Sequence, residues 1–136
     1  MKNTLSILCL ALCFTIASCK KDAGEGGTSS ITGKVLQRDY NGTFPFFYEE
    51  FPAVEQDVYI IYGDEDNTFD NRTRCSYDGT FRFDYLRNGN YKVFAYSYDT
   101  LSSPGDINTD TVMVRSVEIS KRKSTVDAGT ITIIKN

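Results

Sequence analysis

Alternating apolar and polar residues, interrupted at short intervals by turn residues, dominate the sequence from Ile31 onward. The clearest example is the segment 80–85, in which Phe81, Phe83 and Tyr85 alternate with polar residues, as in a strand with one buried face. Asp-Gly precedes this segment and Asn-Gly follows it, and both dipeptides are strong turn signals. Beyond the N-terminal segment there is no sustained 3.6-residue apolar period. We therefore expect an all-β fold, with these three aromatic side chains facing the core.

The same pattern predicts seven strands. They are Ile31–Gln37, Asp57–Tyr62, Asn71–Tyr77, Thr80–Tyr85, Tyr91–Tyr98, Thr111–Ile119 and Thr130–Ile134. The segment 57–62 is apolar on both faces, which is typical of a central strand, whereas 71–77 is polar and is expected at an edge. Many short strands with closely spaced turns favour an antiparallel sandwich or a barrel.

The N-terminus has the organisation of an export signal. Lys2 precedes an apolar run at 5–16, which is too short to span a bilayer as a stable helix and suits a signal peptide. The sequence Ile16-Ala17-Ser18-Cys19 resembles the lipobox of bacterial lipoproteins. That resemblance implies that residues 1–18 are cleaved off and that lipid, including acyl chains, is attached to Cys19. The alternative is an ordinary secreted protein cut near Ser18.

The residues after the cysteine bear on where the protein is held. In Gram-negative lipoproteins an Asp at this place favours the inner membrane, and Lys20 does not match that signal. We therefore expect a lipid anchor in the outer membrane of the cell envelope, with its periplasmic or surface side left open. Lys20-Lys21-Asp22 also loosely resembles the export tags of surface lipoproteins in Bacteroidota. Residues 19–30 are polar and glycine-rich and are expected to form a flexible tether, leaving residues 31–136 as one β-sandwich domain.

Composition excludes several classes of function. The chain has a formal net charge of −3, which argues against nucleic acid and against an anionic membrane surface as partners. It has no histidine, so Ser-His-Asp and Cys-His catalysis and histidine-ligated zinc are excluded, and we expect neither an enzyme nor a cofactor. Cys9 and Cys13 leave with the signal peptide. Cys75 then remains as a free thiol without an intramolecular partner, and it is expected to be a small core residue.

A set of spaced motifs carries a family resemblance. A glycine stands in the first strand at Gly33, Asp-Gly-x-Phe-x-Phe occupies 78–83, a leucine stands at 86, and Gly-x-Tyr-x-Val occupies 89–93. In this order they resemble the carboxypeptidase-regulatory-like or transthyretin-like (prealbumin-like) domain. The resemblance implies a seven-stranded antiparallel, Ig-like sandwich that serves as an accessory module without catalytic residues. The long first connection, 38–56, departs from the family pattern.

The physical role of those motif residues can be stated separately. The glycines at 79 and 89 allow positive φ in turns. Phe81, Phe83, Tyr91 and Val93 are expected to pack between the two sheets.

An aromatic-rich segment between the first two predicted strands is the main candidate binding site. Its aromatic residues are Tyr40, Phe44, Phe46, Phe47, Tyr48 and Phe51. Exposed aromatic side chains in loops commonly mark binding surfaces. The alternatives are that they cover the end of the sandwich, or that 45–51 forms an edge strand.

A second polar segment holds calcium candidates, Asp64, Asp66 and Asp70. The EF-hand spacing fails because Phe69 stands where its glycine belongs, so a solvated loop is the alternative. Glu49 and Glu50 are adjacent and would point to opposite faces of a strand, so they do not form a glycosidase pair.

The function expected from these features is binding or assembly by a non-catalytic accessory module on a membrane, with a protein or glycan partner. One alternative is a glycan-binding lipoprotein that uses Tyr40, Tyr48, Tyr96 and Tyr98, although the chain has no tryptophan for sugar stacking. Another alternative is a structural subunit of a pilus or adhesin.

Overall fold

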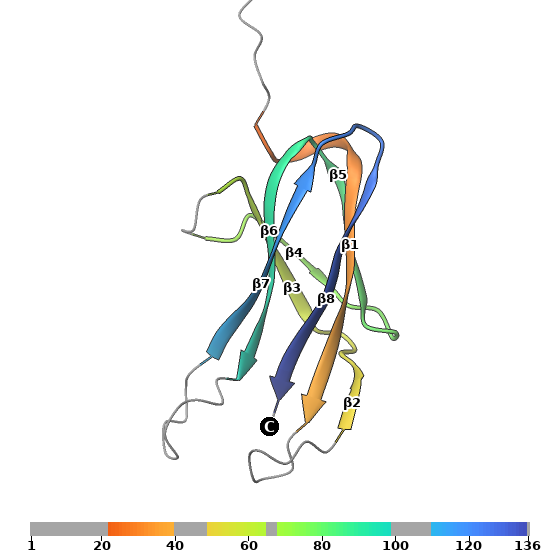
Figure 1. Ribbon diagram of the computed structural model, residues 1–136, viewed down its shortest axis with the longest axis vertical. Helices are drawn as coiled ribbons and strands as arrows, with labels where there is room; N and C mark the ends of the chain where they lie inside the picture. The colour runs from red at the N-terminus through yellow and green to blue at the C-terminus, as the bar shows by residue number, and fades with distance from the viewer. Residues whose placement is uncertain (1–21, 40–48, 65–67, 99–109, 136) are drawn as a thin grey trace, which may run out of the picture.

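The computed structural model describes residues 22–39, 49–64, 68–98 and 110–135, and these ranges form an all-β sandwich without a helix (Figure 1). The strands are β1 (Glu25–Asp39), β2 (Glu49–Pro52), β3 (Asp57–Tyr62), β4 (Asn71–Arg74), β5 (Thr80–Leu86), β6 (Gly89–Tyr98), β7 (Asp110–Ile119) and β8 (Thr125–Lys135). The predicted fold class is confirmed. The one strand beyond the seven expected, β2, overlaps the segment in which an edge strand was the alternative to a binding loop.

The strands divide into two sheets. Sheet B has the order β4-β3-β6-β7, so β3 is central and β4 is at an edge, as predicted. In sheet A, β8 pairs with residues 30–39 of β1 along one edge. The other edge of β1 is shared by β5, along residues 25–34, and by β2, along residues 36–39.

One strand pair differs from the antiparallel arrangement that we expected. β1 and β8 are parallel, whereas the other pairs are antiparallel. The reason is the route of the chain, because β7 belongs to sheet B and the turn after it returns the chain into sheet A alongside β1 rather than back along β7.

The two glycine turns that looked like hairpins instead join the two sheets. The turn at 76–79 connects β4 of sheet B to β5 of sheet A, and the turn at 87–88 connects β5 to β6 of sheet B. In the first turn Gly79 has φ +78°, its N–H donates to Ser76 O at 2.9 Å, and a Cβ there would lie 2.5 Å from Val35 O. Glycine is therefore required both by the backbone conformation and by the neighbouring strand.

The core lies between the sheets and follows the predicted alternation. Phe81, Phe83, Tyr91 and Val93 are all buried, and so is Cys75. The other fully buried large side chains are Ile31, Val35, Val58, Ile60, Leu86, Ile119, Ile131 and Ile133. The sequence period of two residues thus located the buried face correctly in both sheets.

Tyr85 is an exception, and its predicted inward orientation is wrong. Its side chain is 75% exposed, whereas Leu86 beside it is 1% exposed. Tyr85 has φ +60°, and the β1–β5 register shifts at this point, since both Glu25 and Ser29 face Leu86. This bulge breaks the alternation and turns Leu86 inward in place of Tyr85.

The flexible tether predicted for residues 19–30 is also wrong over residues 22–30. β1 begins at Glu25, and Ala23 packs against the core. The glycines that suggested flexibility allow close packing instead, because a Cβ at Gly27 would lie 1.9 Å from Leu86 O. Residues 19–21, including the predicted lipidation site Cys19, lie outside the described ranges.

Candidate functional site

The outer face of sheet B carries a group of apolar side chains that the core does not use. We call the sheet B face the outward residues Tyr59 and Ile61 of β3, Phe94 and Tyr96 of β6, and Val112 and Val114 of β7, together with Phe69, which precedes β4. The strand register brings them together, since Tyr59 is paired with Phe94, Phe94 with Val114, and Tyr96 with Val112. In β3 and β6 the alternate residues Val58, Ile60, Val93 and Ala95 are buried in the core, so alternation assigns Tyr59, Ile61, Phe94 and Tyr96 to the opposite face.

The aromatic rings of this face contact one another. Tyr59 stacks on Phe94 with ring centroids 5.2 Å apart and an interplanar angle of 17°. Phe69 lies 4.7 Å from Tyr59, and Tyr96 meets Tyr59 edge-on at 5.4 Å. Such pairs contribute about 0.5–1.5 kcal/mol each beyond their buried area. The cluster is therefore an ordered surface whose rings hold one another in place.

This ordered surface stays open to solvent. Phe69, Tyr96, Val112 and Val114 are between 42% and 48% exposed. A shallow groove of about 660 Å³ runs over the face, and Lys92 is the one cation among the described residues that line it. Contiguous exposed apolar surface of this kind marks an interaction site more often than scattered single residues do.

Charged residues border the face along β4. Asp57 lies 3.1 Å from Arg74 and 3.5 Å from Arg72 in ion pairs that stay largely exposed. Exposed pairs of this type contribute about 0–1 kcal/mol to stability. An apolar centre with a charged rim has the anatomy of a protein interface.

Of the predicted aromatic binding site, the structure describes one member. Phe51 lies in β2, where it is half-buried and paired with Gln37 of β1. The other five members, Tyr40, Phe44, Phe46, Phe47 and Tyr48, lie outside the described residues. Their role as a binding surface stays a prediction.

The predicted glycan platform is described only in its β6 part. Tyr96 and Tyr98 point outward as expected and are 42% and 48% exposed. The residues that sequence reasoning missed are Tyr59, Phe69, Val112 and Val114. Tyr59 and the two valines have the right alternation for an outer face, but only the strand order shows that they lie beside Tyr96. Phe69 lies outside the strands, so alternation gives no signal for it.

The predicted calcium candidates do not come together in the described ranges. Asp64 is exposed, Asp66 lies outside those ranges, and Asp70 Oδ2 accepts the backbone N–H of Tyr62 at 2.7 Å. Across residues 22–39, 49–64, 68–98 and 110–135, no group of three or more acidic, cysteine or histidine side chains is placed to hold a metal ion.

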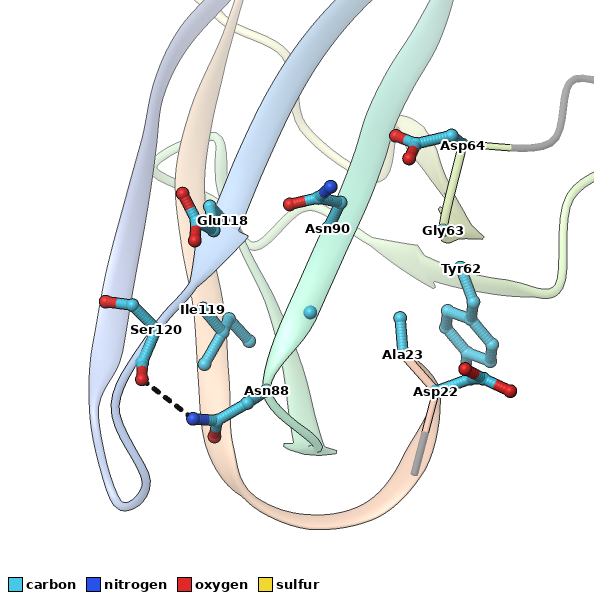
Figure 2. Close-up of a pocket in the computed structure, with 11 residues that line it drawn as sticks. Asp22, Ala23, Tyr62, Gly63, Asp64, Asn88, Asn90, Glu118, Ile119 and Ser120 are labelled. Atoms are coloured by element: carbon cyan, nitrogen blue, oxygen red, sulfur yellow. Dashed lines mark hydrogen bonds between the residues drawn. The ribbon is translucent and has the colours of Figure 1, made fainter. Parts of the chain in front are cut away.

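A second, more polar hollow of about 790 Å³ lies at the end of the sandwich where the described chain begins. Figure 2 shows Asp22 and Ala23 beside the ring of Tyr62, with Glu118 and Ser120 on the opposite side. Asn88 Nδ2 donates to Ser120 O at 2.8 Å. Burial, with help from the hydrogen bond to Glu25, raises the pKa of Tyr62 to about 12, so its hydroxyl stays protonated. The hollow is thus bordered by neutral and acidic groups.

Among the described residues outside the two surfaces, the groups with clear pKa shifts are shifted away from neutrality. Burial raises the pKa of the Cys75 thiol to about 11, which leaves it protonated and a poor nucleophile. Hydrogen bonds from Thr80 lower the pKa of Asp78, and hydrogen bonds from Ser30 and Arg82 lower that of Asp84. Asp78 stabilises its turn, and Asp84 stabilises a strand pair, so neither offers a general acid.

No protein-family model matches the chain, and a comparison with curated proteins finds no significantly similar relative. Within the described ranges there is no helix with the length and apolar character needed to cross a membrane.

Proposed function

We propose that this protein is a lipid-anchored accessory module of a bacterial cell envelope, at the outer membrane, and that it acts without catalysis by binding a protein partner. The observation that carries the binding role is the sheet B face, an ordered and half-exposed apolar surface with a charged rim. The anchor is supported by the Ile16-Ala17-Ser18-Cys19 sequence. The resemblance to the carboxypeptidase-regulatory-like and transthyretin-like domains agrees with an accessory role.

The geometry of the rings favours a protein partner over a glycan. A sugar ring binds against an open aromatic face, but Tyr59 and Phe94 stack on each other and Tyr96 packs edge-on against both. The stacked pair therefore offers less open ring face to a sugar, and the exposed valines of β7 add apolar surface beside it. An apolar side chain from another protein fits such a surface better than a sugar does.

Site-specific crosslinking in intact cells tests this role. A photoreactive amino acid placed at Tyr96 of the full chain is expected to capture a defined protein partner. The matched control is Tyr77, which is 88% exposed and belongs to the 76–79 turn rather than to the sheet B face. Equal capture from both positions, or capture from Tyr77 alone, would refute the assignment of the face.

A substitution separates binding from folding. Val114→Asp places a charge on the face beside Phe94 and is expected to reduce capture at least about tenfold, as loss of a hot-spot contact does. Val54→Asp is the control, because Val54 is 47% exposed, against 43% for Val114, and lies outside the face. Circular dichroism on both variants checks that the fold is intact.

Metabolic labelling with palmitate tests the anchor separately. The full chain is expected to incorporate the label, and Cys19→Ser is expected to abolish incorporation. Label retained in Cys19→Ser would show that the lipid is elsewhere.

A further inference from the structure

The end of the sandwich at which the described chain begins also carries three consecutive cations. Lys121, Arg122 and Lys123 lie in the turn between β7 and β8, and all three are exposed. Arg87 lies at the same end, in the turn between β5 and β6, where its Nη1 donates to Asp22 O at 3.4 Å. In Figure 1 the arch at the start of β1 and the β7–β8 connection lie together, opposite the ends of β1 and β8. We call Arg87 and residues 121–123 the basic end.

Hydrogen bonds hold the backbone of this turn against the start of β1. Lys121 O accepts from Ser124 Oγ at 2.7 Å and from Ser29 Oγ at 3.1 Å. The backbone N–H of Lys123 donates to Thr28 Oγ1 at 3.3 Å. Since Ser29 is fully buried, the turn has a fixed position and its three cationic side chains project from it.

The backbone conformation of Lys123 suits glycine better than lysine. Its φ is +55°, a left-handed conformation that glycine adopts with less strain. A residue other than glycine at such a position points to a constraint besides local folding. What lysine adds over glycine here is a side chain with a positive charge.

Carboxylates near this end include Asp22 and Glu118, which line the hollow in Figure 2. Glu25 accepts hydrogen bonds from Tyr62 and Asn71. Asp84, near the start of β1, accepts from Ser30 and Arg82. Within the described residues no ion pair joins the turn 121–123 to a carboxylate. The chain as a whole is mildly acidic, yet this turn presents a local excess of positive charge.

The anchor brings the basic end close to lipid. Residues 22–24 pack on the domain, since the N–H of Gly24 donates to Tyr91 Oη at 3.0 Å and Ala23 packs against the core. Only residues 20 and 21, both lysines, separate Cys19 from Asp22. Three residue steps of at most about 3.8 Å each span roughly 11 Å. A lipidated Cys19 would therefore keep this end within reach of lipid headgroups.

We propose that the basic end docks on a membrane surface of anionic lipid headgroups and so orients the sandwich with its opposite end away from the membrane. This inference rests on the lipid anchor of the proposed function. The charge complements an anionic surface, and the chain enters the domain at this end. The ends at Asp39 and Glu49, which flank the predicted aromatic segment, would then point outward, and the sheet B face would stand beside the membrane rather than against it.

Lysine footprinting on reconstituted protein tests the orientation. The full chain is produced in bacteria, its intact mass is measured, and it is reconstituted into vesicles of phosphatidylcholine alone or mixed with phosphatidylglycerol. A membrane-impermeant acylating reagent then labels exposed lysines. Labelling of Lys121 and Lys123 is expected to slow at least about fivefold on the anionic vesicles. Each cation near an anionic surface contributes about 1 kcal/mol of binding free energy, which corresponds to about a fivefold change. Lys135, exposed at the opposite end, is the internal control and should not change.

Salt and one substitution sharpen the test. The slowing should disappear in about 1 M salt, where the screening length is about 3 Å. Lys123→Gly suits the left-handed backbone and removes one charge, so it is expected to weaken the shielding of Lys121 about fivefold while the fold stays intact. Lys135→Gln removes one charge elsewhere and should leave that shielding unchanged.

The outcomes distinguish this inference from the anchor itself. An intact mass without lipid would refute the anchor, and the orientation with it. A lipid-bearing protein whose Lys121 and Lys123 are labelled equally on both vesicle types would overturn the orientation and leave the anchor standing. In that case a soluble acidic partner would be the remaining occupant for the basic end.

Discussion

Tyr91→Phe tests whether the N-terminal residues are part of the folded domain. The ring of Tyr91 is buried and contacts Tyr62 edge-on at 5.8 Å, and phenylalanine keeps this packing. Only the hydroxyl is lost. That hydroxyl donates to Arg87 O at 2.7 Å and accepts from the N–H of Gly24 at 3.0 Å, so it joins the start of the described chain to the β5–β6 turn.

The cost follows from the two groups left without a partner. A buried donor or acceptor that loses its hydrogen bond costs about 1–3 kcal/mol. The bond to Arg87 O is only partly buried, so water can replace it, and we expect about 2 kcal/mol for the pair rather than twice the single value. For a domain of this size that corresponds to a fall in Tm of roughly 8 °C.

Thermal unfolding of the full chain, followed by circular dichroism, measures this shift. Tyr85→Phe is the matched control, because it also removes one phenol hydroxyl but from a side chain that is 75% exposed. Its Tm should stay within about 1 °C of the parent. Equal Tm values for the two variants would refute the docking of Gly24 and restore a flexible tether through residues 22–24.

Three further outcomes are expected. Gly79→Ala should lower the free energy of unfolding, measured in urea, at least twice as much as Gly129→Ala. Both glycines have a left-handed φ, which costs alanine about 1–2 kcal/mol, but only at Gly79 would the added Cβ meet a neighbour, 2.5 Å from Val35 O. Equal losses would contradict this. Cys75 should resist iodoacetamide at pH 8 in the folded protein and react only on unfolding, since burial raises its pKa to about 11; rapid native labelling would contradict its burial. The free energy of unfolding should fall as pH rises from about 9 to 12. In the unfolded chain Cys75 and Tyr62 ionise near their ordinary pKa values of 9.0 and 10.0, whereas in the folded protein their pKa values are about 11 and about 12. A flat profile would argue against both shifts.

The candidate site was less accessible to sequence reasoning than the fold. Tyr96 could be placed outward from alternation alone, but Phe69 stood in a segment that was read as polar and metal-binding. Its ring lies 4.7 Å from that of Tyr59, a contact that depends on how the chain before β4 returns along β3. Local patterns carry no information about such contacts between segments.

Glycine shows the same limit at the N-terminus. A stretch rich in glycine and serine reads as a flexible linker, because those residues add little apolar surface. In the structure Gly27 lies so close to Leu86 that no side chain would fit, and Gly24 and Gly26 adopt positive φ. Whether a glycine provides freedom or close packing is decided by what lies next to it.

The alternation of apolar and polar residues is a local property of each strand, so the sequence alone was enough to predict an all-β chain and several of its core residues. Phe81, Phe83, Tyr91 and Val93 were assigned on that basis and are buried. The grouping of strands into sheets and the parallel pairing of β1 with β8 could be read from the structure alone, and so could the sheet B face and the basic end. Those features arise where distant segments meet, and the free energy of such meetings depends on packing and hydrogen bonds between residues far apart in the chain.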